Sequence, residues 1–148
     1  MKNPSRLSAS EAADILLKGG VVAFPTETVY GLGASALNPD AVARIFEIKK
    51  RPFFNPLICH LPDSESVFRY GTENPLARKL SEFWPGPLTI LLPHENRIPK
   101  IVTASSPLCA FRVPDHPIAL DLLKKTGVPV AALQPICSVE EVPQTHQW

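Results

Sequence analysis

Residues 21–34 read VVAFPTETVYGLGA, and this stretch does most to decide the fold. Its first four residues, 21–24, form a short apolar run that is typical of a buried strand. Pro25 ends the run, and the polar and glycine-rich residues 25–34 predict a loop. Because α/β sheets bind ligands in the loops at the ends of their strands, the stretch predicts a strand followed by a ligand loop.

Helical patterns flank this strand on both sides. Upstream, Ser8 lies three residues before Glu11, which is the spacing of a capping box, and the helix ends before Gly19-Gly20. Downstream, Asn38-Pro39-Asp40 is a helix start, and the helix runs to the basic residues 49–51. The residues expected to face inward from these two helices are Ala12, Ala13, Leu16, Leu17, Val42, Ile45, Phe46 and Ile48.

The rest of the chain repeats the alternation of short strands and helices. Apolar runs at 57–61, 88–92, 108–113 and 128–132 predict strands. Helices are predicted to start at Asp63, at Asn74 and near Pro117, and a polar loop follows residue 92. The second of these helices should turn Leu76, Leu80, Phe83 and Trp84 inward. The pattern predicts a single α/β domain built on a twisted mixed sheet, at least partly parallel and flanked by helices.

Composition limits the classes of function. The chain has 148 residues, the size of one domain, with 45% apolar and 20% charged residues, which excludes a disordered chain. A net charge of +1 argues against strong non-specific binding to nucleic acid. Its three cysteines, Cys59, Cys109 and Cys137, lack CxxC spacing, which indicates a reducing compartment and no structural zinc site. Without a signal peptide or a long apolar run, we expect a soluble cytoplasmic protein with no membrane partner.

The first candidate segment for chemistry is the loop after residue 24. Thr26, Glu27 and Thr28 offer hydroxyls and a carboxylate, while Gly31 and Gly33 would let the backbone approach a ligand closely. The alternative is a β-turn followed by a glycine-rich connection.

The second candidate segment is KKRPFFNPLICH, residues 49–60. The basic residues 49–51 could simply cap a helix, because the helix dipole favours cations there. Arg51 and Asn55, just before a buried strand, are nevertheless the components of a phosphate clamp. His60 ends that strand, and a lone histidine in such a place is most often a satisfied core residue.

The third candidate is Arg112, which interrupts the apolar strand at 108–113. A buried arginine needs a partner, and either an anionic ligand or Asp115 in the following turn could serve; from the residues alone the Arg112–Asp115 ion pair is favoured. The chain has no GxSxG, Walker A, HExxH or GxGxxG motif. Residue patterns alone therefore lead to a soluble α/β domain with an anion site.

Three separated motifs, FPTETVYGLGA at 24–34, KKRPFFNPLICH at 49–60 and FRVPDHP at 111–117, resemble the YrdC/Sua5 family. The resemblance runs from about residue 8 to 132. It implies an L-threonylcarbamoyladenylate synthase, a nucleotidyltransferase that joins L-threonine, bicarbonate and ATP into threonylcarbamoyl-AMP and pyrophosphate. The product feeds partner enzymes of the tRNA t6A37 modification. The implied fold is a twisted α/β sheet with a concave, basic ligand face.

The resemblance also assigns roles to residues. Those implied to contact threonine are Thr28, His60 and Arg112, with Arg112 on its carboxylate. Those implied to bind ATP are Lys49, Arg51 and Asn55. Magnesium would bridge the ATP phosphates, and neither a catalytic acid–base pair nor a protein metal ligand is implied.

The chain departs from the family in two places. Leu108 stands where many members carry a threonine near ATP. After PVAA at 129–132, members continue into PSANxSGxxSPT, whereas this chain reads Leu133-Gln134-Pro135-Ile136. We therefore expect a domain at 8–132 that is incomplete at its C-terminal end, an aberrant and poorly ordered tail at 133–148, and little or no synthase activity.

A reading-frame shift is the proposed origin of the tail. Codons allowed for residues 133–144, read from the third base of the Leu133 codon, permit Ser-Ala-Asn-Leu-Phe-Gly and later Ser-Pro-Thr. A natural alternative C-terminus, for instance from splicing, is the competing explanation.

Three other functional readings remain open. The chain could be a non-enzymatic module that binds double-stranded RNA or tRNA, a fragment of a hydrogenase-maturation carbamoyltransferase, or a folded but inactive remnant. Steep salt-dependent binding of duplex RNA without ATP turnover would favour the first of these.

Overall fold

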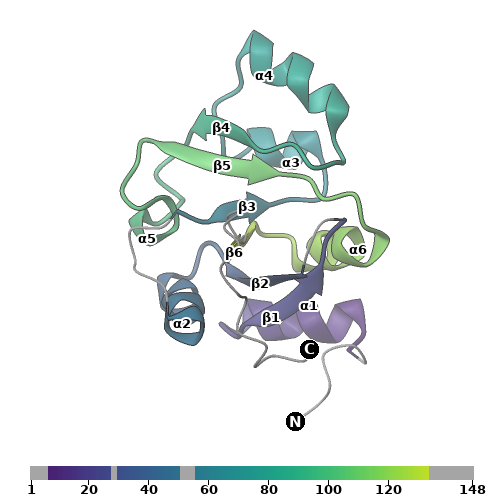
Figure 1. The fold of residues 1–148 in the computed structure, drawn as a ribbon, viewed down its shortest axis with the longest axis vertical. Helices are drawn as coiled ribbons and strands as arrows, with labels where there is room; N and C mark the ends of the chain where they lie inside the picture. The colour runs from purple at the N-terminus through teal and green to yellow at the C-terminus, as the bar shows by residue number, and fades with distance from the viewer. Residues whose placement is uncertain (1–6, 28–29, 51–55, 134–148) are drawn as a thin grey trace.

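The computed structural model describes residues 7–27, 30–50 and 56–133. Its centre is a six-stranded mixed sheet in the order β1-β2-β6-β3-β5-β4 (Figure 1). The strands are β1 (Val22–Pro25), β2 (Tyr30–Ser35), β3 (Ile58–His60), β4 (Ile90–Pro93), β5 (Leu108–Arg112) and β6 (Val130–Leu133). Strands β3 and β5 pair in parallel, and the other described pairs are antiparallel. The expected α/β class with a mixed sheet is confirmed.

The helices are α1 (Ala9–Leu17), α2 (Pro39–Lys49), α3 (Ser64–Phe68), α4 (Pro75–Leu80), the 3-10 turn η2 (Ser81–Phe83), α5 (Lys100–Thr103) and α6 (Pro117–Thr126). Their starts follow local capping. The Ser8 hydroxyl accepts a hydrogen bond from the Glu11 backbone N–H at 3.1 Å, and the Asn38 side chain accepts from the two N–H groups at 40 and 41. Helix α2 ends where Lys50 adopts a left-handed conformation with φ 51°.

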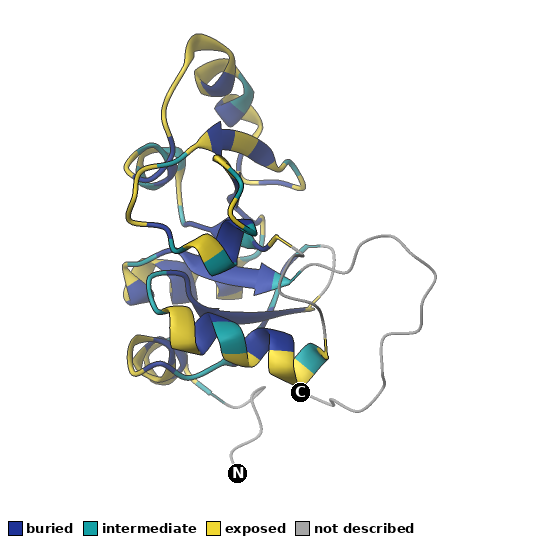
Figure 2. Cartoon of the chain, turned by 90° about the vertical axis from the view of Figure 1, so that its left-hand side faces the viewer, coloured by how far each residue is buried: buried dark blue, intermediate teal, exposed yellow. Residues whose placement is uncertain are grey.

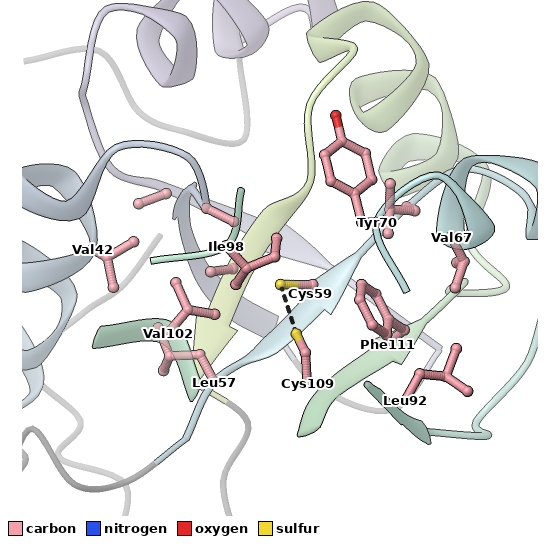
Figure 3. Packing of buried hydrophobic residues seen from close by; sticks show 14 of the residues in the cluster. Val42, Leu57, Cys59, Val67, Tyr70, Leu92, Ile98, Val102, Cys109 and Phe111 are labelled. Atoms are coloured by element: carbon pink, nitrogen blue, oxygen red, sulfur yellow. Dashed lines mark hydrogen bonds between the residues drawn. The ribbon is translucent and has the colours of Figure 1, made fainter. Parts of the chain in front are cut away.

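Helices cover both faces of the sheet and turn their buried sides towards it (Figure 2). Helices α1 and α6 pack on β1, β2 and β6, where their apolar residues meet Val22, Phe24, Val130 and Ala132. The opposite face carries the larger core, which includes Leu32, Ala34, Cys59, Cys109 and Phe111 together with residues of α2, α3, α4 and α5. Figure 3 shows the part of this core around Cys59, Cys109 and Phe111. Alternation along each strand sends neighbouring residues to opposite faces.

Two expected loops are wrong. Residues 30–35 form β2, which pairs antiparallel with β1, and part of the polar stretch after β4 forms α5. A strand rich in glycine carries little propensity of its own, so it becomes recognisable only through the partners on either side of it.

Four residues expected to face inward are exposed instead: Leu17, Ile48, Leu76 and Phe83. In α4 the reason is geometric. The helix tightens into η2 after six residues, which changes the direction of Phe83, and in α4 itself Ala77 is buried while Leu76 is exposed. Trp84 is buried, as expected. The Trp84 indole N–H donates to the Leu88 carbonyl at 2.7 Å.

No helix within residues 7–27, 30–50 and 56–133 is long and apolar enough to cross a membrane. Leu133, which the sequence prediction assigned to the tail, is the last residue of β6 and pairs with Leu32. Residues 134–148 lie outside the described part of the chain, so the prediction about their order stays a prediction.

Candidate functional site

His60 and Arg112 lie side by side at the ends of the parallel strands β3 and β5. They are register partners, so their side chains leave the sheet on the same face. Both residues are buried. Two polar side chains from different segments of the sequence therefore meet at one strand end, which is where α/β sheets gather ligands.

The guanidinium of Arg112 forms an ion pair with Glu27. Arg112 Nη2 contacts Glu27 Oε1, and the backbone N–H of Asp115 donates to Glu27 Oε2. The expected Arg112–Asp115 ion pair is wrong, because Asp115 contributes its backbone while its side chain stays exposed. Burial lowers the pKa of Arg112, but a guanidinium starts so high that it remains charged.

The imidazole of His60 is neutral. Its Nδ1 lies 3.1 Å from the Ile58 carbonyl and 3.3 Å from the Val130 carbonyl, so Nδ1 carries the hydrogen and donates it. Burial lowers its pKa to about 4. Nε2 is then a buried acceptor with no hydrogen-bond partner among the described residues. Such a nitrogen can accept a hydrogen bond from a ligand's hydroxyl or amine.

The two glycines of β2 make room for a core side chain. A Cβ on Gly33 would lie 2.7 Å from Phe24 Cε1 and 2.7 Å from Val130 Cγ1, while one on Gly31 would meet Phe24 at 3.4 Å. The ring of Phe24 thus occupies the space that the glycines leave. The sequence prediction assigned that space to a ligand, and here the structure corrects it.

The site lies where the helical cover of the sheet ends. Helices α1 and α6 cover this face over β1, β2 and β6. On the same face, Leu91 of β4 and Leu108 of β5 remain 60% and 40% exposed. Within the described ranges, the sheet around Arg112 therefore changes from a covered to an open surface. Leu108, the departure noted in the sequence, belongs to the open half.

Lys49 is predicted to bind ATP, and the described residues do not test that role. Lys49 is the last residue of α2, which packs on the opposite face of the sheet through Val42, Ile45 and Phe46. Within the described residues, no hydrogen bond or ion pair joins Lys49 to His60 or Glu27. Thr28, Arg51 and Asn55 lie outside the described residues, so their predicted places in the site remain predictions.

The sequence did not predict that Glu27 belongs to this cluster. As one of three polar residues after a strand, it gave no sign that it would reach Arg112. Its contact at Asp115 spans 88 positions of the chain. No group of three or more histidine, cysteine, aspartate or glutamate side chains in the described part of the chain could hold a metal ion.

The fold and the buried polar cluster define an α/β domain with a candidate ligand site at the ends of its parallel strands. The family model Sua5_yciO_yrdC, described as telomere recombination, matches residues 14–147. The chain belongs to this Sua5/YrdC family.

Two curated relatives carry the same name. The threonylcarbamoyl-AMP synthase of Pyrococcus abyssi is 46% identical over 123 residues, which cover 82% of this chain and 36% of the relative. That of Bacillus subtilis is 47% identical over 126 residues, covering 83% of this chain and 36% of the relative. The chain therefore spans just over a third of the length of these relatives.

A solved structure agrees with these similarities. The crystal structure of P. abyssi Sua5 complexed with L-threonine superposes with a TM-score of 0.80 at 45% identity. The match covers 84% of this chain and 37% of that structure. The twisted mixed sheet is thus the fold of the family.

Proposed function

We propose that this chain carries the threonine and ATP sites of a threonylcarbamoyl-AMP synthase, which joins L-threonine, bicarbonate and ATP for the t6A37 modification of tRNA, and that its altered tail leaves it with little or no activity. One observation carries the proposal. The buried, charged guanidinium of Arg112 lies beside the neutral imidazole of His60, in a chain 46% identical to a threonylcarbamoyl-AMP synthase. A relative of known structure is described as complexed with L-threonine, which supports threonine as the amino acid.

Threonine would bind at the Arg112 end of the site. Its carboxylate pairs with the Arg112 guanidinium, which is suited to carboxylates by shape and charge. Its hydroxyl or amine donates to Nε2 of His60, which remains a neutral acceptor because burial lowers the pKa of the imidazole. Thr28, adjacent to Glu27, adds a hydroxyl from the connection between β1 and β2.

The reaction needs positioning more than an acid–base pair. Bicarbonate takes up a proton and loses water to give carbon dioxide. The threonine amine then bonds to the carbon of carbon dioxide and loses a proton, which replaces the one taken up, so the net products are a carbamate and water. A carbamate oxygen then forms a bond to the α-phosphorus of ATP, and the bond to pyrophosphate breaks. Since the nucleophile is already anionic, the protein contributes orientation and neutralisation of charge.

The ATP side of the proposal rests on Lys49, Arg51 and Asn55. Cationic and amide groups would hold the phosphates, and Lys49 would add charge from the end of α2. Magnesium bound to ATP would bridge the phosphates and reduce their charge.

The direct test uses a chain in which the family motif after Ala132 has been restored, and measures threonylcarbamoyl-AMP and pyrophosphate together in the presence of threonine, bicarbonate and ATP. Arg112→Ala should weaken threonine binding more than ATP binding, by on the order of 2–5 kcal/mol for a buried bidentate pair. Arg51→Ala should do the reverse. Equal losses of both ligands in both variants would show that the roles are assigned wrongly.

The tail requires its own test. A chain that continues after Ala132 as Ser-Ala-Asn-Leu-Phe-Gly and on to Ser-Pro-Thr should form threonylcarbamoyl-AMP, and the present chain should form little or none. A coding sequence that cannot be read as this motif in another frame would contradict the frame-shift explanation. Normal turnover by the 148-residue chain would contradict it as well.

A further inference from the structure

We propose that Glu27 is a resident carboxylate: it occupies the receptor for the substrate's carboxylate in the free protein and is displaced when substrate binds. The identity of the incoming ligand, the amino acid L-threonine, rests on the proposed function. The receptor and its present occupant are both described by the structure.

The receptor consists of two donors that share one carboxylate. Arg112 Nη2 contacts one oxygen of Glu27, and the backbone N–H of Asp115 donates to the other. A guanidinium beside a backbone amide is a favourable arrangement for any carboxylate, because each oxygen receives its own charge-assisted or backbone hydrogen bond. The same two donors would serve the α-carboxylate of an amino acid equally well.

The carboxylate site is filled in the free protein because Arg112 is buried. The side chain of Arg112 is 4% exposed, and a charge so far from water is strongly destabilising without an anion beside it. Glu27 supplies that anion in the free protein. An arriving carboxylate would replace one anion by another, so the charge of Arg112 is balanced both before and after binding.

Glu27 is the member of the pair that can leave. Its side chain is 18% exposed, against 4% for Arg112, and it extends from the connection after β1 instead of from a strand interior. Arg112 is fixed in β5 between two neighbouring strands. Displacement therefore requires rotation of one glutamate side chain towards solvent and no change in the sheet.

The neighbouring imidazole is an independent indication of a ligand. His60 is the register partner of Arg112, and its Nε2 is a buried acceptor with no partner among the described residues. Buried polar atoms are normally hydrogen-bonded. An amino acid that takes the place of Glu27 at Arg112 would bring a hydroxyl or an amine close to this nitrogen.

If threonine displaces Glu27, removing the charge of Glu27 should raise the affinity for threonine. Glu27→Gln keeps the shape of the side chain but removes the charge that competes for Arg112. Threonine should then bind more tightly, by about tenfold, which corresponds to about 1.4 kcal/mol. If Glu27 instead held the ligand's ammonium or merely oriented Arg112, the same substitution would weaken binding.

The experiment is calorimetric titration of L-threonine into the full chain, Glu27→Gln and Asp121→Asn. Asp121 is an exposed carboxylate on α6 that pairs with Lys125, so its variant removes one negative charge from a neighbouring element and leaves the receptor intact. We expect tighter binding only in Glu27→Gln. Unchanged or weaker binding in that variant overturns the inference while leaving the proposed function standing.

A second measurement does not depend on the variant folding. In the wild-type chain with 13C-labelled glutamate, the carboxyl signal of Glu27 should shift as threonine saturates the site, because the side chain exchanges Arg112 for water. A signal that stays unchanged at saturation overturns the inference. Failure of threonine to bind either the wild-type chain or Glu27→Gln refutes the proposed function and the inference together.

Discussion

The ring of Phe24 meets the imidazole of His60 edge to face, with ring centroids 5.4 Å apart and an interplanar angle of 80°. This contact joins the first strand of the sheet to the candidate site. Phe24 in turn lies against Gly31 and Gly33 of β2. The packing of Phe24 therefore helps to shield His60 from solvent and to keep its imidazole neutral.

The fit of Phe24 predicts different effects at the two glycines. In Gly33→Ala, the new Cβ would be too close to the ring and to Val130, and overpacking of this kind costs about 1–3 kcal/mol. In Gly31→Ala the contacts are ordinary, at 3.4 Å, so the loss should be clearly smaller. Urea denaturation of the two variants measures the difference. Equal stabilities would show that Phe24 does not require the small residue at position 33.

His60 predicts a dependence of stability on pH. Its pKa is about 4 in the folded chain and 6.5 when unperturbed, so between these values the unfolded chain binds more protons. The free energy of unfolding should fall as the pH is lowered from 6.5 to 4, by up to about 3 kcal/mol from this residue, and stay level above 6.5. Urea denaturation across this range tests the prediction.

The control is His60→Gln, which cannot titrate and should lose that part of the pH dependence. An NMR titration of the imidazole provides a direct check in the wild-type chain. A midpoint near 6.5 would contradict the buried, neutral state.

The sulfur atoms of Cys59 and Cys109 lie 3.6 Å apart in the core between β3 and β5 (Figure 3). The hydrogen bond from Cys109 and burial raise the pKa of the Cys59 thiol, so little reactive thiolate forms. In a Cys137→Ser background, both thiols should resist a disulfide reagent in the native chain and react together once it is unfolded. Rapid labelling of either thiol under native conditions would contradict the packing.

The cap of α2 predicts a local loss of stability. Asn38 accepts hydrogen bonds from two backbone N–H groups of the first turn, and Asn38→Ala should cost about 1 kcal/mol of unfolding free energy. Asn96→Ala, at an exposed asparagine outside the helices, should have little effect. If both variants unfold at the same urea concentration, the cap contributes nothing measurable.

The sequence predicts the structure correctly where that structure depends on residues close together in the chain. Ser8, Asn38 and Asn74 were assigned as caps because a cap bonds to groups two or three positions ahead in the chain. The prediction failed at β2, where the strand exists through its pairing with β1 and β6. It also failed at Leu76 and Phe83, because α4 is too short for its periodicity to define a buried face.

The sequence by itself determined the family, the mixed α/β class, and the candidate residues His60 and Arg112. Three motifs in the same order are specific enough to identify the family. Short apolar runs predict most of the strands. Only the tertiary structure decided that Gly33 makes room for Phe24, and that Glu27, 88 positions from Asp115, is the anion beside Arg112. The physical reason is that a buried charge or a buried ring takes whichever partner the sheet brings within a few ångströms, and strand pairing determines that neighbour independently of distance along the chain.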